Sequence, residues 1–189
     1  MEKKIYLLLT DTGTWFTKCI KLYTKKTFNH ASLALDHQFN HVYSFGRKRP
    51  HNPFIGGFVK ENIRSPFFHH TKCAIYSCSV SEEQLQQITN YLEIIDTQKH
   101  KYRYNLLGLF AIIFNKNLER PHAFFCSQFV ATLLEKGKIT GLTKPASLIT
   151  PHDLIQLPQL EVIYEGKLSN YIHSLDEGRK GTSHLKLAL

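Results

Sequence analysis

The chain contains the sequence NHASLALDHQFNHVYSFG at residues 29–46. Its composition predicts a strand from His30 to Asp36, a turn at His37-Gln38 and a return strand from His41 to Phe45. We therefore expect a β-hairpin. A turn centred on His37 places His30 opposite Ser44, and a shift by one residue would place Phe45 there instead.

The segments on either side of this hairpin predict an α+β fold, a small antiparallel sheet packed with helices. Further strands are expected at Ile5–Leu9, Cys73–Val80 and Leu160–Tyr164. Helices are expected at Trp15–Tyr23, at Leu85–Ile95 after a capping box at Ser81 and Gln84, at Asn105–Phe114, at Cys126–Lys136 and after Thr150-Pro151. The helix at Asn105–Phe114 is apolar on all sides and is expected at the centre. Gly46–Gly57, rich in glycine, proline and basic residues, is expected to be a loop.

Length and composition favour one domain with a sizeable core. We expect residues 1–175 of the 189 to form it and residues 176–189 to be a flexible tail. The chain has four cysteines, none in a C-x-x-C pair, and the apolar run near its start is too short for a secretory signal. Free thiols indicate a reducing cytoplasm, and Leu106–Phe114 is too short to cross a bilayer.

The chain carries a formal net charge of +9, from 24 basic and 15 acidic residues. This charge permits weak association with anionic surfaces. No helix carries a long basic stripe, so nucleic acid is not expected as a partner. The one tight cluster, Arg47-Lys48-Arg49, follows the hairpin. It either meets an anionic group of a substrate or forms an ordinary solvated loop.

Cys126 lies where an apolar segment leads into a predicted helix. A cysteine in the first turn of a helix feels the positive end of the helix dipole and several unpaired backbone N–H groups. Both favour the thiolate, which is the nucleophilic form. The alternative is a small buried hydrophobic residue at a helix end.

A nucleophilic cysteine needs a histidine as base and a polar group that orients the histidine. Among the 11 histidines, His30 is the best placed, because its small neighbours allow a helix to pack closely. The alternative is a half-buried strand histidine. Ser44 is the candidate orienting residue, since Asp36 lies about 20 Å further along an extended strand.

His69, His70, Cys73 and Cys78 match no common zinc spacing, and strand alternation points the two cysteines to opposite faces. No metal or other cofactor is therefore expected. Arg47, Trp15 and Tyr43 are the candidate substrate-binding residues.

Residues 29–36, 42–46 and 125–130 together resemble the circularly permuted, YiiX/YaeF-like branch of the NlpC-type papain-like cysteine peptidases and amidases. The resemblance covers residue 5 to about residue 165 and implies a papain-like fold in which the histidine precedes the cysteine. It implies that Cys126 is the nucleophile and His30 the base. The third position of the family, often a glutamate or another polar group on the strand after the histidine strand, falls on or near Ser44.

The resemblance implies a cysteine hydrolase that cleaves an amide bond in a small peptide or a cell-wall-derived substrate. Related enzymes, similar to lecithin retinol acyltransferase, use the same core for acyl transfer on lipids, so a lipid or thioester acyl substrate is an alternative. A binding module without efficient catalysis is a third hypothesis, because a serine at position 44 adds no charge that would stabilise an imidazolium.

Overall fold

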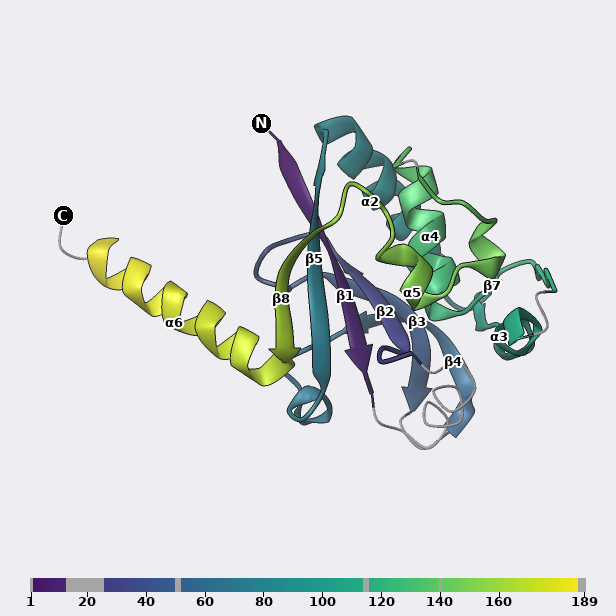
Figure 1. Ribbon diagram of the computed structural model, residues 1–189, viewed down its shortest axis with the longest axis horizontal. Coiled ribbons are helices and arrows are strands. Elements are labelled where there is room, and N and C mark those ends of the chain that lie inside the picture. Colours follow the sequence, from purple (N-terminus) through teal and green to yellow (C-terminus); the bar gives the residue numbers. More distant parts are fainter. Residues whose placement is uncertain (1, 13–25, 50–51, 114–115, 140, 187–189) are drawn as a thin grey trace.

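The computed structural model describes residues 2–12, 26–49, 52–113, 116–139 and 141–186 (Figure 1). These residues form a six-stranded antiparallel sheet with helices packed on it, which confirms the α+β class. The strand order is β4-β3-β2-β1-β5-β8. The strands are β1 (Lys3–Asp11), β2 (His30–Ala34), β3 (Val42–Arg49), β4 (Asn52–Glu61), β5 (Lys72–Val80) and β8 (Glu161–Lys167). A short parallel pair joins β6 (Arg103–Tyr104) to β7 (Ala123–Phe124).

The helices lie on both sides of the sheet. They are α2 (Glu82–Thr97), α3 (Leu106–Ile113), α4 (Cys126–Lys136), α5 (Pro151–Leu154) and α6 (Leu168–Lys186), with 3-10 turns at Pro66–Phe68 and Ala146–Leu148. Figure 1 shows α2 and α4 on one side, whereas α6 leaves the end of β8 on the other. The predicted capping box at Ser81 is confirmed: Gln84 N donates to Ser81 Oγ, and Ser81 N donates to Gln84 Oε1.

Each face of the sheet has its own core because side chains alternate along the strands. Leu7, Leu33 and Phe45 belong to the cluster under α2 and α4, where the Phe45 ring lies 4.8 Å from that of Phe129. On the other face, strand residues such as Leu8 pack with Tyr171 of α6. A sheet buried on both faces explains why β1 is apolar at successive positions.

The predicted β2–β3 hairpin forms, but its register is shifted by two residues. Leu33 pairs with Tyr43 and Ala34 with Val42, so the turn is centred on Gln38 rather than His37. The Asp36 carboxylate holds this longer turn by accepting the N–H groups of Asn40 and His41. A shift of two residues leaves each side chain on the same face of the sheet.

The predicted loop at Gly46–Gly57 is wrong, because most of it is strand. Strands β3 and β4 pair from Gly46–Gly57 to Arg49–Asn52. A Cβ on Gly56 would lie 2.7 Å from Cβ of Tyr104. This glycine therefore permits the close approach of β6 and does not mark a turn.

Two helices differ from their predicted place or length. Helix α3 is peripheral, since Leu107 is 58% exposed, and the expectation of a central helix is wrong. Helix α6 continues to Lys186, into the segment 176–189 that we expected to be a flexible tail. An ion pair of 3.1 Å between Arg64 and Asp176 ties the helix to the body beyond that point. The predicted helix at Trp15–Tyr23 falls within residues 13–25, outside the described residues.

Candidate active site

The start of α4 places Cys126. Phe125 is extended, and its N–H donates to Oε1 of the buried Gln128 at 3.4 Å. The Ser127 hydroxyl donates to the carbonyl of Ile149 at 2.7 Å. These two bonds fix the first turn of α4, and Cys126 lies there only 4% exposed.

The hairpin opens at the point where Cys126 approaches it. Leu35 N donates to His41 O, so Leu33 and Ala31, at alternate positions, direct their N–H groups toward the same neighbouring strand, β3. The pairing of β2 with β3 ends at Leu33. The N–H of Ala31 instead donates to the thiol of Cys126. The end of the β2–β3 pairing thus leaves the N–H of Ala31 for the sulfur of Cys126.

His30 connects the thiol to a carboxylate. Its side chain is hydrogen-bonded to Cys126, and its Nε2 lies 2.7 Å from Oε1 of Glu61. Since Nε2 is occupied by Glu61, Nδ1 is the ring nitrogen left for the thiol. The side chains of His30 and Glu61 are only 14% and 8% exposed. The arrangement is therefore cysteine, histidine and carboxylate in a shielded row.

Two serines hold Glu61 in place. Glu61 ends β4 and reaches past β3 toward β2, because β3 lies between these strands. Ser44 Oγ donates to the same oxygen, Oε1, that faces His30. Ser32 Oγ donates to the other oxygen, Oε2, at 2.7 Å. Three donors on one buried carboxylate indicate that it is ionised.

The charges of this row stabilise one another. Burial disfavours an imidazolium, but the charge of Glu61 and the bonds to Cys126 and Glu61 outweigh it and raise the pKa of His30 to about 10. Burial also opposes ionisation of Cys126. The His30 bond and charge and the N–H groups of Ala31 and Ser127 outweigh it and lower the pKa of the thiol. The pKa of Glu61 is lowered against burial by His30 and both serines. At neutral pH His30 is therefore an imidazolium beside a carboxylate, and the thiol of Cys126 ionises more readily than an ordinary thiol.

The structure brings together three of the predicted site residues. Cys126 and His30 are in contact, and Ser44 lies beside them. Ser44 is not the direct partner of His30, however, because Glu61 occupies that position. The error follows from the register: His30 lies near Gly46, where an added Cβ would be 3.6 Å from both His30 Cε1 and Ser44 Oγ.

Of the predicted substrate-binding residues, Tyr43 has a described side chain, and it packs into the core. The Tyr43 ring stacks on Phe58 at 5.9 Å and packs against the core under α2 and α4. Arg47 lies on β3, where its backbone pairs with Gly56. Trp15 lies outside the described residues.

Sequence reasoning missed Glu61 and Ser32. The aromatic and β-branched pairs Phe54-Ile55 and Phe58-Val59 are typical of a strand, a signal that the assignment of Gly46–Gly57 to a loop obscured. Once β4 is recognised as the partner of β3, Glu61 is a carboxylate on a strand near the histidine strand. Ser32 follows from alternation, because it shares a face with His30.

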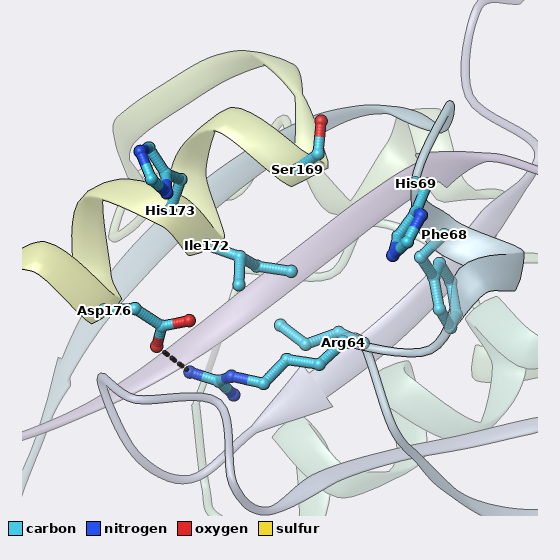
Figure 2. A pocket seen from close by; sticks show the side chains of 8 residues that line it. Arg64, Phe68, His69, Ser169, Ile172, His173 and Asp176 are labelled. Carbon is cyan, nitrogen blue, oxygen red and sulfur yellow. Dashed lines mark hydrogen bonds and ion pairs between the residues drawn. The ribbon is translucent and has the colours of Figure 1, made fainter.

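A cavity in the described part of the chain is lined by none of the residues of this row. This cavity of about 270 Å³ lies between α6 and the segment after β4, lined by residues that include Ile63, Arg64, Phe68 and Ile172 (Figure 2). The ion pair of Arg64 with Asp176 crosses its edge. Among the described residues, no group of three or more His, Cys, Asp and Glu side chains is arranged to hold a metal ion. None of the described helices combines the length and apolarity that a membrane span needs.

Comparisons of the chain with models of protein families, with curated proteins and with solved structures found no match.

Proposed function

We propose that the protein is a cysteine-dependent hydrolase that cleaves an amide bond of a small peptide or a cell-wall-derived substrate. The observation that carries the proposal is the row of Cys126, His30 and Glu61, in which a thiol contacts a histidine held by a buried carboxylate. This is the set of groups that activates a thiol as a nucleophile and keeps its base oriented. The resemblance to permuted NlpC-type enzymes supports the same proposal, because the histidine precedes the cysteine in the chain.

The proposed reaction has two halves. The thiolate of Cys126 attacks the amide carbonyl, and backbone N–H groups at the first turn of α4 stabilise the oxyanion. His30 then gives its proton to the leaving amine, which leaves a thioester on Cys126. Next, His30 takes a proton from a water molecule that attacks this thioester. The carboxylic acid is released, and the thiolate and the imidazolium return. Throughout, Glu61 stabilises the imidazolium.

A labelling experiment tests the proposal before a substrate is known. The rate at which iodoacetamide labels Cys126 should stay high well below the ordinary thiol pKa of about 8.5. It should fall at least tenfold at pH 6 when His30 is replaced by glutamine. The buried Cys73, whose pKa is raised to about 12 by burial, is the internal control. Labelling of Cys126 no faster than that of Cys73, or unaffected by His30→Gln, would contradict the proposal.

The row of Cys126, His30 and Glu61 bears differently on the two other hypotheses, a binding module and an acyl transferase. The argument for a binding module was the lack of an acid beside His30, and Glu61 removes that argument. Acyl transfer from a lipid or thioester uses the same three groups. A panel of peptide amides, esters and thioesters, with mass spectrometry of the acyl-Cys126 adduct, distinguishes the substrates, and Cys126→Ala should abolish every adduct.

A further inference from the structure

Helix α3 is apolar along its whole length but lies at the edge of the molecule (Figure 1). Its eight residues read Leu-Leu-Gly-Leu-Phe-Ala-Ile-Ile. Leu107 is 58% exposed, and four further side chains are only half-buried, those of Leu106, Leu109, Ala111 and Ile112. A helix that is apolar on all sides is normally covered, either in a core or by lipid. The described residues of this chain leave part of its apolar surface uncovered.

The segment that follows α3 returns to the start of the helix. Lys116 N donates to the carbonyl of Ala111 at 2.9 Å, at the end of the helix. Asn105, which directly precedes α3, donates from Nδ2 to the carbonyl of Leu118 at 3.2 Å. Leu118 is itself 38% exposed. A second exposed leucine therefore belongs to the same end of α3 as Leu107.

Basic residues without ionic partners flank these two leucines. Residues 101–122 contain four basic residues and one acidic residue. Arg103, Lys116 and Arg120 are exposed, and within the described part of the chain none of the three forms an ion pair. Arg103 lies on β6, just before α3, and Arg120 lies two residues after Leu118. The charge beside the uncovered apolar surface is therefore positive.

We propose that α3, Arg103 and the loop Lys116–His122 form a docking surface for an anionic lipid bilayer. Leu107 and Leu118 enter the boundary between headgroups and acyl chains, and the basic residues meet the negative headgroups. Eight helical residues rise only about 12 Å, so α3 lies in the interface and does not cross the bilayer.

The charge favours a bilayer over a second copy of this chain. Symmetric pairing of two copies through this surface would set the same basic residues against one another, and like charges in contact repel. An anionic bilayer offers negative charge beside an apolar layer, which matches both parts of the surface.

Vesicle flotation of the full chain tests the charged part of the surface. Vesicles of phosphatidylcholine with about 30% phosphatidylserine should bind the protein at least tenfold more tightly than phosphatidylcholine alone, and added salt should weaken the binding. Arg103→Gln with Arg120→Gln should weaken it about tenfold or more, since each basic residue near such a surface contributes about fivefold. Lys4→Gln with Lys72→Gln, at exposed positions of β1 and β5, removes the same charge and should change it less than about threefold.

The apolar part of the surface is tested by its two leucines. Leu107→Gln with Leu118→Gln should weaken binding to the anionic vesicles about tenfold or more, because the buried apolar area is lost. Ile94→Gln, at a position of α2 that is 50% exposed, is the control. Leu107→Trp should add fluorescence that brominated acyl chains quench, whereas Ile94→Trp should not. The midpoint of urea unfolding reports that each variant is folded.

Three results would overturn the proposal. The first is no binding to the anionic vesicles at millimolar lipid, or equal binding to neutral ones. The second is an equal loss of binding in the control variants, or fluorescence of Leu107→Trp that the brominated chains do not quench. The third is soluble polyglutamate that binds as tightly as the vesicles whether or not Leu107 and Leu118 are replaced, which would assign the surface to an acidic protein partner.

Discussion

Glu61 is the residue that holds His30 in the candidate site. It faces His30 with one oxygen and is held by Ser44 on that oxygen and by Ser32 on the other. Removing a buried charge while its partner stays is costly, because the partner loses the interaction that offset its desolvation. The imidazolium of His30, and through it the thiolate of Cys126, therefore depends on this carboxylate.

Glu61→Gln should raise the pH at which Cys126 becomes reactive. The amide keeps the shape of the carboxylate but not its charge, so the pKa of His30 should fall from about 10 and the thiolate should lose its counter-ion. We expect the labelling rate at pH 6 to drop about tenfold or more, because one pKa unit corresponds to a factor of ten. Glu93→Gln, on an exposed position of α2, is the control. An unchanged pH profile would argue against a role for Glu61.

Ser32→Ala and Ser44→Ala should act through Glu61. Each substitution removes one hydrogen bond to a buried carboxylate, which costs about 1.5–3 kcal/mol of stability. Urea unfolding measures this loss. If the serines position Glu61, the pH profile of Cys126 labelling shifts upward as well, and Ser→Thr at either position restores it in part. A loss of stability without a shift in the profile would assign them a structural role alone.

At the scale of elements, the site depends on how closely α4 packs on its neighbours. The helix ends at Lys136 as predicted, but the left-handed residue after it is Lys138, at φ 54°, rather than Gly137. Gly137 serves a different purpose. A Cβ there would lie 2.8 Å from two carbons of the fully buried Ile88 on α2.

Gly137→Ala should therefore destabilise the protein by about 1–3 kcal/mol, the usual cost of overfilling a packed contact. Gly178→Ala on α6 is the matched control, since its Cβ meets nothing within 4 Å. In a helix that substitution should be neutral or stabilise by up to about 1 kcal/mol. Urea unfolding of both variants measures the difference, and equal stabilities would show that α2 and α4 adjust freely.

At the scale of the whole molecule, the site joins parts that are far apart in sequence. β2 supplies His30, β4 supplies Glu61 and α4 supplies Cys126. The charges of this row exist in their paired form only when all three elements are in place. Folding and ionisation are therefore linked.

The stability contributed by the His30–Glu61 pair should depend on pH from both sides. The pKa of His30 is raised from 6.5, so its contribution is complete below 6.5 and is lost as the pH rises toward about 10. The pKa of Glu61 is lowered from 4.5, so its contribution is complete above 4.5 and is lost at lower pH. The pair should therefore stabilise the fold most between about pH 4.5 and 6.5.

Unfolding free energies with and without His30→Gln measure this contribution, with Cys126→Ser in both proteins so that the thiol does not titrate. Without the thiol, Glu61 alone raises the pKa of His30, so the decline should begin above pH 6.5 and finish below about 10. At pH 5.5 the difference should be about 3 kcal/mol or more, as for a broken buried pair. A difference independent of pH would contradict the charged pair.

The sequence by itself determined the class of the fold and singled out Cys126 and His30 as candidate site residues. Strand and helix periods and the cap at Ser81 are local signals, so the elements around them could be predicted. Cys126 and His30 could be found because Cys126 lies at the start of a predicted helix and His30 at the start of a predicted strand. Local patterns carry this information because they depend on neighbours within a few residues.

Only the tertiary structure decided what holds His30. The register of β2 against β3 depends on the length of the turn between them, which the Asp36 carboxylate sets. The approach of Glu61 to His30 depends on the pairing of β4 with β3, and the glycines in that paired segment had suggested a loop. The prediction that α3 lies at the centre was wrong for a similar reason. An apolar composition does not say which other element, if any, will cover the helix. Pairing across strands and packing between elements are long-range interactions, and the spacing of residues along the chain does not fix them.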